Sequence, residues 1–285
     1  SINYFPVFLF YWRKQPGRGE KGEKMSFSKM TLKELALYLE ERGRLSPAEE
    51  AQLQADRRRG AGLLLERYRK RQERERLEEA RLQKMLRQER FFWRQGIKYI
   101  AGVDEAGRGP LAGPVVAAAV ILPPETTIRY LDDSKKLTAA RREVLYDEIK
   151  AVALGSAVGI CSPAEIDRLN IYEATMKAMR GALSALPLEP GVALVDGFPI
   201  HGLKLPQRAI PGGDALSLSI AAASVVAKVT RDRIMLDLHR RYPEYGFDRN
   251  KGYGTREHLL ALGRYGPCPE HRRSFRGIDL EREGS

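Results

Sequence analysis

Cysteine is nearly absent from this chain: its 285 residues include only Cys161 and Cys268. Two cysteines are too few for the disulfide framework of a small secreted protein, and they do not have a zinc-site spacing. The four histidines form no HExxH pattern, and no Gly-x-Ser-x-Gly occurs, so neither zinc chemistry nor a serine nucleophile is supported. A reducing compartment, the cytoplasm, is the simpler expectation.

Long apolar runs are missing as well. The most apolar segment, Tyr4–Trp12, has about half of the ~20 residues that a membrane-spanning helix needs. No basic segment precedes it and no small-residue cleavage site follows, which argues against a signal peptide. Residues 1–24 are therefore expected to be a non-native or disordered leader before a natural start at Met25, with an interfacial anchor as the alternative.

Acidic residues are in the minority, with 37 Asp and Glu against 49 Lys and Arg. Residues 1–95 hold 23 basic and 14 acidic side chains, whereas residues 96–285 hold 26 and 23. This asymmetry indicates a polyanion-binding extension on a nearly balanced domain, with a solvated helical face as the alternative. The hydrophobic content of 43% is enough for a packed core.

Capping signals organise residues 25–95. Thr31 and Ser46 are each followed three residues later by Glu, which is the spacing of a capping box. A longer helix, dense in Arg and Glu, is expected over Ala61–Trp93. The segment is therefore predicted to be a small all-α extension that binds substrate through a basic helix.

The pattern changes after Gly96. The apolar runs Tyr99–Val103 and Val115–Leu122, joined by the Gly-rich segment Ala106–Pro114, predict two strands. Two further strands and four helices are expected downstream, at Ala153–Ile160, Val192–Val195, Ala139–Val152, Asn170–Leu186, Ala215–Tyr242 and Arg256–Arg264. Residues 96–285 are thus predicted to form a mixed α/β sheet flanked by helices, with a C-terminal helical part.

Four carboxylates stand at the ends of these elements. Asp104 and Glu105 close one apolar strand, Asp196 closes another, and Asp214 opens the Ala-rich helix. Each has an ordinary explanation, namely a solvated strand end, a turn or an N-cap. Because the carboxyl ends of adjacent strands can converge on one cleft, a carboxylate cluster is the joint prediction.

Such a cluster has chemical consequences. Carboxylates that lie together repel at neutral pH and need protons or cations between them. Oxygen donors without neighbouring His or Cys favour Mg²⁺ or Mn²⁺ over zinc. Two such ions can activate water and stabilise the leaving oxygen of a phosphodiester, so phosphoryl transfer is the predicted chemistry.

The first carboxylate pair lies in a segment that resembles a known family. Residues 99–116 read YIAGVDEAGRGPLAGPVV, which is similar to the opening signature of ribonuclease HII. Further stretches continue the resemblance in family order: Asp133–Leu137, Val195–Gly197, Gly213–Asp214 leading to Ser219–Asp232, Asn250–Thr255 and His271–Phe275. Together they cover nearly all of residues 97–276.

The resemblance implies an RNase H-like fold and an endonuclease that cleaves the RNA strand of RNA–DNA hybrids. It also implies cutting at single ribonucleotides embedded in duplex DNA, with 3′-hydroxyl and 5′-phosphate products. Asp104, Glu105, Asp196 and Asp214 match the family's four metal-binding catalytic carboxylates, which hold two Mg²⁺ or Mn²⁺ ions. The segment 25–95 resembles the N-terminal extension of some bacterial members.

Substrate contacts follow from the same resemblance. Gly107, Arg108 and Gly109 match a loop that reads the ribose 2′-hydroxyl, and Tyr253 matches a residue that packs on the following deoxyribose. Glycines let backbone approach a ligand closely, and an arginine can reach phosphate. Candidate phosphate contacts are Ser134, Lys135, Lys136 and Lys251. A structural glycine turn, a core tyrosine and ordinary surface lysines are the alternatives.

Three other functions fit parts of the pattern. Ribonuclease HIII has related carboxylates but usually carries Lys at the position of Arg108 and has a β-rich N-terminal domain. A resolvase-like DNA nuclease and a non-catalytic nucleic-acid-binding protein are the others. The expected partners are RNA–DNA hybrid and ribonucleotide-containing duplex DNA, bound by a monomer without a membrane. A replication or repair partner is left open, and no binding peptide is evident in Gly277–Ser285.

Overall fold

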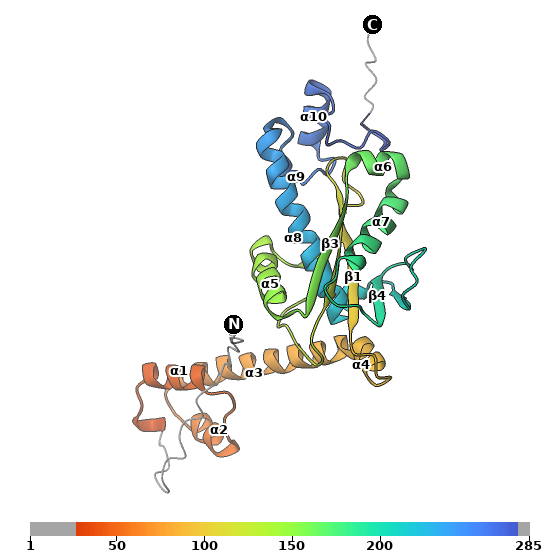
Figure 1. The fold of residues 1–285 in the computed structure, drawn as a ribbon. Coiled ribbons are helices and arrows are strands. Elements are labelled where there is room, and N and C mark those ends of the chain that lie inside the picture. The colour runs from red at the N-terminus through yellow and green to blue at the C-terminus, as the bar shows by residue number, and fades with distance from the viewer. Residues whose placement is uncertain (1–26, 279–285) are drawn as a thin grey trace, which may run out of the picture. The chain divides into compact units, whose positions relative to one another are not determined.

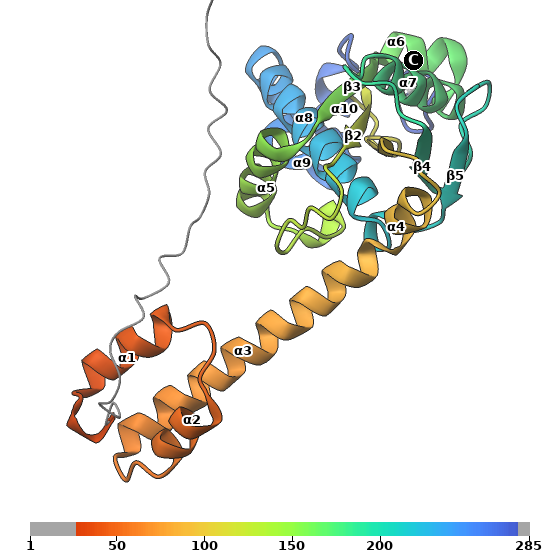
Figure 2. The ribbon, with the colours of Figure 1, turned by 60° about the horizontal axis from the view of Figure 1, so that its bottom comes forward.

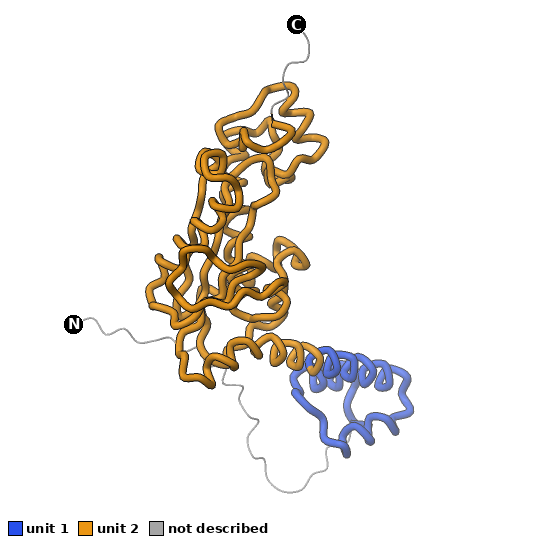
Figure 3. Tube along the Cα trace, turned by 90° about the vertical axis from the view of Figure 1, so that its right-hand side faces the viewer, with its two compact units in different colours: residues 1–75 blue, residues 76–285 orange. Residues whose placement is uncertain are grey.

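The computed structural model describes residues 27–278 (Figure 1). The expectations for residues 1–24, for Met25 and for the segment after Ile278 lie outside this range. The chain divides into two compact units between Glu75 and Arg76 (Figure 3). In the part that the structure describes, no helix has the length and apolarity to cross a membrane.

The first unit is helical, as expected. It contains the 3₁₀ turn η1 (Phe27–Lys29), α1 (Leu32–Glu41), α2 (Pro47–Gln54) and the beginning of α3 (Arg59–Met85). Both predicted capping boxes are present, at Thr31 and Ser46, and each closes its helix start with two reciprocal hydrogen bonds. A small core joins the helices through buried apolar side chains, among them Leu35, Leu39, Leu53, Leu65 and Tyr68.

The long helix expected over Ala61–Trp93 is two helices. Leu86 separates α3 from α4 (Arg87–Trp93), and Leu82, Met85 and Leu86, which share one helical face, all enter the core of the second unit. Residues 76–95 therefore pack with the sheet. The compact units divide twenty residues before the boundary expected at residue 95, because burial of this segment outweighs the change in composition.

The second unit is built on a five-stranded mixed sheet, which confirms the predicted architecture. Its strands are β1 (Ile100–Ala106), β2 (Val115–Ile121), β3 (Gly155–Cys161), β4 (Val192–Asp196) and β5 (Gln207–Ile210), in the order β3-β2-β1-β4-β5. Strands β1, β2 and β3 pair antiparallel, whereas β1, β4 and β5 run parallel. The edge strand β5 was not predicted, since its four residues include Gln207 and Arg208 and show no apolar run.

Helices cover both faces of the sheet (Figures 1 and 2). On one face lie α5 (Ala139–Val152) and α8 (Leu218–Arg241), and on the other lie α6 (Pro163–Leu169) and α7 (Ile171–Ser184). Strand β2 is buried on both sides, because Ala118 and Val120 join the first cluster whereas Ala117 and Ala119 join the second. The shorter elements are η2 (Ser134–Lys136), η3 (Gly213–Ala215), η4 (Pro243–Tyr245), α9 (Phe247–Asn250) and α10 (Arg256–Tyr265).

Gly102 on the central strand sets the distance to α8. A Cβ at this position would lie 2.0 Å from the carbonyl carbon of Ser219 and 2.4 Å from the nitrogen of Ile220. Such separations are far inside van der Waals contact, so only glycine permits this packing. The first turn of α8, and with it the segment that carries Asp214, is thereby brought directly against β1.

Candidate active site

Asp104 and Glu105 lie within β1 rather than just beyond it. Val103 pairs with Val195 across the parallel β1–β4 ladder, so Asp104 and Asp196 occupy the next positions along two neighbouring strands. Asp104 lies on the same side of β1 as Gly102, toward α8, where it interacts with Ser224. Its side chain is 5% exposed.

Asp214 is not the N-cap of the long helix. It lies in η3, and α8 begins after Ser217, whose hydroxyl accepts a hydrogen bond from the N–H of Ile220. The carboxylate of Asp196 accepts a 2.6 Å bond from the N–H of Gly213 and so ties the end of β4 to this turn. The capping role that would have explained Asp214 is therefore taken by another residue.

The carboxylates perturb one another electrostatically. Burial, and then the charges of Glu105 and Asp196, raise the pKa of Asp104 well above its ordinary value. Burial also raises the pKa of Glu105, with Arg108 opposing and Asp196 adding to the shift. Burial, Asp133 and Asp196 raise the pKa of Asp214 to about 6. The structure thus brings the four predicted residues into one electrostatic cluster.

One cation and one further acid belong to this cluster. Burial by itself lowers the pKa of Lys135, but the surrounding carboxylates, Asp133, Asp214, Asp104 and Asp196, raise it above its ordinary value. Asp133 was not among the predicted site residues, although it opens the stretch Asp133–Leu137. Ser224 was missed because a serine within an Ala-rich helix carries no sequence signal of its own.

The donor set suits a hard divalent cation, because it consists of clustered carboxylate oxygens and has no neighbouring thiolate or imidazole. Among residues 27–278, no three His, Cys, Asp or Glu side chains are arranged as ligands around one point. Ion binding would accordingly require the carboxylates to rotate toward one another, and their role as ligands stays a prediction.

The two predicted substrate loops lie side by side. Arg108 is exposed and its guanidinium is 3.5 Å from a Glu105 oxygen. Tyr253 follows α9 and is 47% exposed. A Cβ on Gly109 would stand 3.8 Å from the Tyr253 ring, so the glycine-rich loop and the tyrosine border the same space.

The remaining predicted contacts differ in accessibility. Ser134 is buried, and its hydroxyl accepts a 2.9 Å bond from Ser224. Lys136 is exposed and lies 3.4 Å from Asp132, whereas Lys251 donates to the carbonyl of Asp248 at 2.7 Å. Lys228, which was left outside the catalytic group, pairs with Asp232. Phosphate contacts by Ser134, Lys135, Lys136 and Lys251 stay predictions.

A buried histidine pair supports the Tyr253 loop. His258 Nδ1 is 2.9 Å from the carbonyl of Tyr253, so this nitrogen donates. Burial lowers the pKa of His258, which leaves its Nε2 as an acceptor for the His271 Nε2–H at 2.9 Å. His271 Nδ1 in turn accepts from the N–H of Cys268 at 3.0 Å. Both rings are thus held neutral in defined tautomers.

This pair predicts acid sensitivity. Burial and the neighbouring His258 lower the pKa of His271 from its ordinary 6.5 to about 4. Because the folded state binds the proton less readily than the unfolded state, the stabilisation is complete above pH 6.5 and is lost as pH falls toward 4. It amounts to about 3 kcal/mol. Urea unfolding of the parent should give a lower free energy of unfolding at pH 4.5 than at pH 7.5. His271→Gln should lose this difference between the two pH values, whereas the exposed control His201→Gln should keep it.

Glu89 on α4 is 1% exposed and joins α4 to α8. Its carboxylate accepts a 2.6 Å bond from the Ser217 hydroxyl and a 2.9 Å bond from the N–H of Ser219. Burial raises the pKa of Glu89 although these bonds favour its charged form. An acid at a helix N-terminus also complements the helix dipole. Sequence analysis missed this residue, which fixes the helix turn next to Asp214.

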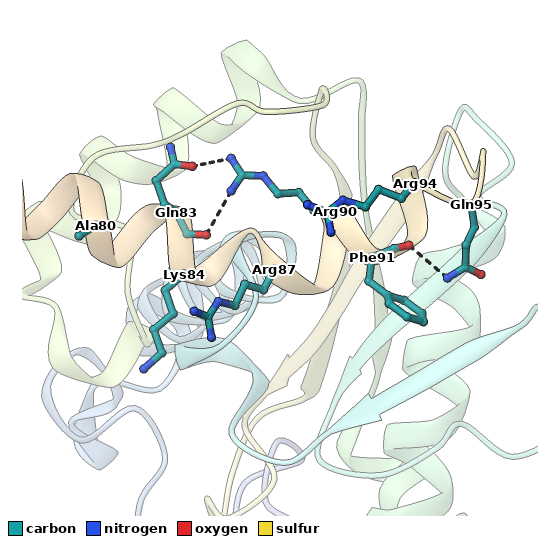
Figure 4. Close-up of a pocket in the computed structure, with 8 residues that line it drawn as sticks. All are labelled: Ala80, Gln83, Lys84, Arg87, Arg90, Phe91, Arg94 and Gln95. Atoms are coloured by element: carbon teal, nitrogen blue, oxygen red, sulfur yellow. Dashed lines mark hydrogen bonds between the residues drawn. The ribbon is translucent and has the colours of Figure 1, made fainter.

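The outer face of α3 and α4 is concave and basic (Figure 4). A groove of about 920 Å³ runs along it within the second unit. Its lining consists of Ala80, Gln83, Lys84, Arg87, Arg90, Phe91, Arg94 and Gln95. Arg90 is engaged by Glu125 and Gln83, whereas Lys84, Arg87 and Arg94 make no ion pair within residues 27–278.

This sheet, with acids on its central strand and on the neighbouring strand, defines the RNase H-like class of nucleases. The chain is similar in structure to ribonuclease H2 from Pyrococcus horikoshii OT3, with a TM-score of 0.57 and 29% identity over 63% of this chain and 95% of that one. A PCNA:RNase HII complex from Archaeoglobus fulgidus gives a TM-score of 0.53 and 31% identity, over 62% and 95% of the two chains.

Sequence comparison identifies the family within this class of nucleases. The family model for ribonuclease HII matches residues 101–278, and that for the ribonuclease HII N-terminal domain matches residues 31–93. A ribonuclease HII from Desulfitobacterium hafniense is 53% identical over 79% of this chain and 87% of its own length. One from Geobacillus thermodenitrificans is 53% identical over 86% and 94%. The chain belongs to the ribonuclease HII family, whose members are hydrolytic endonucleases of the ribonuclease H type.

Membership confirms the family expectation and argues against two of the three alternatives. A ribonuclease HIII-type protein is not supported, because the N-terminal unit is helical and matches the ribonuclease HII extension. A purely binding protein is excluded by the enzymatic character of the family.

Proposed function

We propose that this chain cleaves the RNA strand of RNA–DNA hybrids and cuts at single ribonucleotides in duplex DNA, leaving 3′-hydroxyl and 5′-phosphate ends. Asp104, Glu105, Asp196 and Asp214 are its catalytic carboxylates. The observation that carries the proposal is the convergence of these acids: Asp104 and Asp196 occupy corresponding positions on neighbouring strands, and Asp196 accepts a bond from the N–H of Gly213 beside Asp214. A protein that only bound phosphates would gain nothing from such a negative cluster beside them.

Divalent cations are the cofactors in this proposal, two Mg²⁺ or Mn²⁺ ions held by the four carboxylates. When bound, such ions would supply an activated water and neutralise charge on the scissile phosphate. Without cations the cluster carries unfavourable repulsion, which Lys135 relieves only in part. This chain's own contribution is to hold the acids close and largely buried.

The loops provide substrate selection. The backbone of Gly107–Gly109 approaches the ribose, where the 2′-hydroxyl can both donate and accept hydrogen bonds. Tyr253 packs on the neighbouring sugar across the same space. Arg108 pairs with Glu105 in the structure and would exchange this partner for a phosphate of the substrate.

Cleavage of a duplex with one embedded ribonucleotide tests the proposal. Strand scission is expected with Mg²⁺ or Mn²⁺ and is expected to disappear with a chelator. The same duplex with deoxyribose, or with a 2′-O-methyl group, should bind without being cut. Equal cleavage of an all-DNA junction would contradict the proposal in favour of a resolvase-like nuclease.

The extension is proposed to strengthen duplex binding through the basic groove. Glu89 links the groove-bearing helix to the turn that follows Asp214, which supports a shared substrate. Replacing Lys84, Arg87 and Arg94 by Gln should raise KM by ~10-fold with little change in kcat. Because each phosphate contact contributes ~0.9 to the slope of log affinity against log salt, the slope should fall by up to ~3.

A charge-matched control separates the effect of the groove from the effect of the net charge of the protein. Lys150, Arg168 and Lys204 are exposed and lie outside the groove. Their triple Gln variant changes the net charge equally and should leave KM within about twofold of the parent. If both variants raised KM alike, the groove would have no special role, and the effect would be that of overall charge.

Monomeric action is also proposed, and a replication or repair protein is the partner to be tested. The Archaeoglobus relative is known in a complex with PCNA. Sedimentation of the full chain with and without a sliding clamp would test both points.

A further inference from the structure

The segment His271–Phe275 was singled out in the sequence but has no part in the proposed chemistry. In the structure it lies against the glycine-rich loop. Residues Ala112 and His271 form an isolated antiparallel bridge, Arg272 N–H donates to the carbonyl of Leu111 at 2.9 Å, and Gly113 N–H donates to Glu270 at 2.8 Å. Arg272 is thereby carried beneath the loop, where it is 0% exposed.

The Arg272 guanidinium is occupied by backbone carbonyls. Nη2 donates to the carbonyl of Gly107 at 2.5 Å, Nη1 to that of Arg108 at 2.9 Å, and Nε to that of Gly113 at 2.9 Å. It forms no ion pair with any carboxylate of residues 27–278. Burial and the charge of Arg231 lower its pKa to about 9, which leaves it protonated at neutral pH.

A second buried arginine also donates to backbone carbonyls of the glycine-rich segment. Arg231 on α8 donates to the carbonyls of Pro114, Ala112 and Lys251 at 3.0–3.1 Å. A buried cation without an anionic partner is costly, whereas an apolar side chain would avoid that cost but leave the bonded carbonyls without a donor. Satisfying buried backbone is therefore one reason for arginine at these positions.

The direction of the bonded carbonyls supplies a second reason. In a trans peptide the C=O and the following N–H point in opposite directions, and the described residues contain no cis bond. Since the carbonyls of Gly107 and Arg108 point inward to Arg272, the N–H groups of Arg108 and Gly109 point outward. Neither N–H makes a hydrogen bond within residues 27–278, and both residues are exposed on the side of Tyr253.

We propose that Arg272 is a positioning residue for ribose recognition, which holds two consecutive backbone N–H donors of the glycine-rich loop toward the sugar of the scissile nucleotide. This inference rests on the proposed function and deepens it. Arg272 itself does not touch substrate. The fork geometry matters as well as the charge, because lysine cannot bond three carbonyls in one plane.

Arg272→Lys and the control Arg273→Lys test the proposal, because Arg273 is the exposed neighbour on the same segment. With Arg272→Lys, kcat on the single-ribonucleotide duplex should fall by ~10²-fold, as expected for a reacting group displaced by ~1 Å. Affinity for the all-DNA duplex of the same sequence should stay within about threefold, since phosphate contacts dominate it. Arg273→Lys should match the parent in both measurements.

The outcomes are distinguishable. A folded Arg272→Lys enzyme with kcat within threefold of the parent, or with equal losses of kcat and DNA affinity, would overturn the positioning role. Failure of the parent itself to cut the single-ribonucleotide duplex would instead contradict the proposed function. If Arg272→Lys does not fold, amide exchange of the parent decides: the Arg108 and Gly109 amides must become protected by the ribonucleotide duplex with chelator present, and not by its all-DNA counterpart.

Discussion

Asp104→Asn is expected to abolish cleavage and at the same time to stabilise the metal-free protein. Loss of the carboxylate that is proposed as a central metal ligand should lower kcat by at least ~10³-fold, which corresponds to about 4 kcal/mol of transition-state stabilisation. Burial, and then the charges of Glu105 and Asp196, raise the pKa of Asp104, so its charged form is unfavourable and a neutral amide removes both the burial cost and the repulsion. A relief of ~1 kcal/mol would raise Tm by ~2–4 °C in a unit of this size.

The measurement combines a cleavage assay with thermal unfolding in chelator at pH 8. Asp237→Asn is the matched control, because Asp237 is exposed and, among residues 27–278, pairs only with Arg240 on the same helix. It should retain both activity and Tm. An Asp104→Asn protein that was inactive and less stable would show that Asp104 holds the fold together, and the electrostatic account of the cluster would be wrong.

Gly102→Ala should disrupt both the fold and the site. The new Cβ would meet backbone of Ser219 at 2.0 Å, and backbone cannot rotate aside as a flexible side chain can. Helix α8 would have to move off β1, at a cost of ~3 kcal/mol or more in the free energy of unfolding. Activity of the folded fraction should also fall, because the movement separates Asp214 from Asp104.

Gly181→Ala gives the comparison. Gly181 lies in α7, where an added Cβ would have its nearest contact at 3.7 Å from the Cα of Gly159. Alanine favours helix over glycine by ~1 kcal/mol, so this variant should be as stable as the parent or more so. Chemical unfolding of both variants, with cleavage assays at a temperature where each is folded, would separate a packing effect from a general intolerance of side chains.

Much of the fold was predictable from the sequence because its signals are local. The capping boxes at Thr31 and Ser46 and the strand that ends at Asp196 depend on residues a few positions apart. The interruption at Leu86 was not predictable, since the helical pattern continues through it: Leu82, Met85 and Leu86 keep helical spacing and lie in one core.

The candidate site also divides into residues with a local sequence signal and residues that only long-range contacts identify. Its acids could be named from the motifs, because each stands in a distinctive local context. Their supporting residues could not: Ser224 resembles any serine in a helix, and Glu89 resembles the other acids of a highly charged segment. What distinguishes Glu89 is its contact with residues 128 and 130 positions later, and no short-range pattern carries that information.

The bond between Glu89 and the start of α8 makes the catalytic unit depend on chain outside its own sequence signature. The match to the catalytic family begins at residue 101, yet a fragment cut there would leave the Ser219 amide and the Ser217 hydroxyl without their acceptor. A fragment beginning at Arg76 would retain it. The segment Arg87–Trp93 thus stabilises the start of α8 from outside the region that the catalytic family model matches.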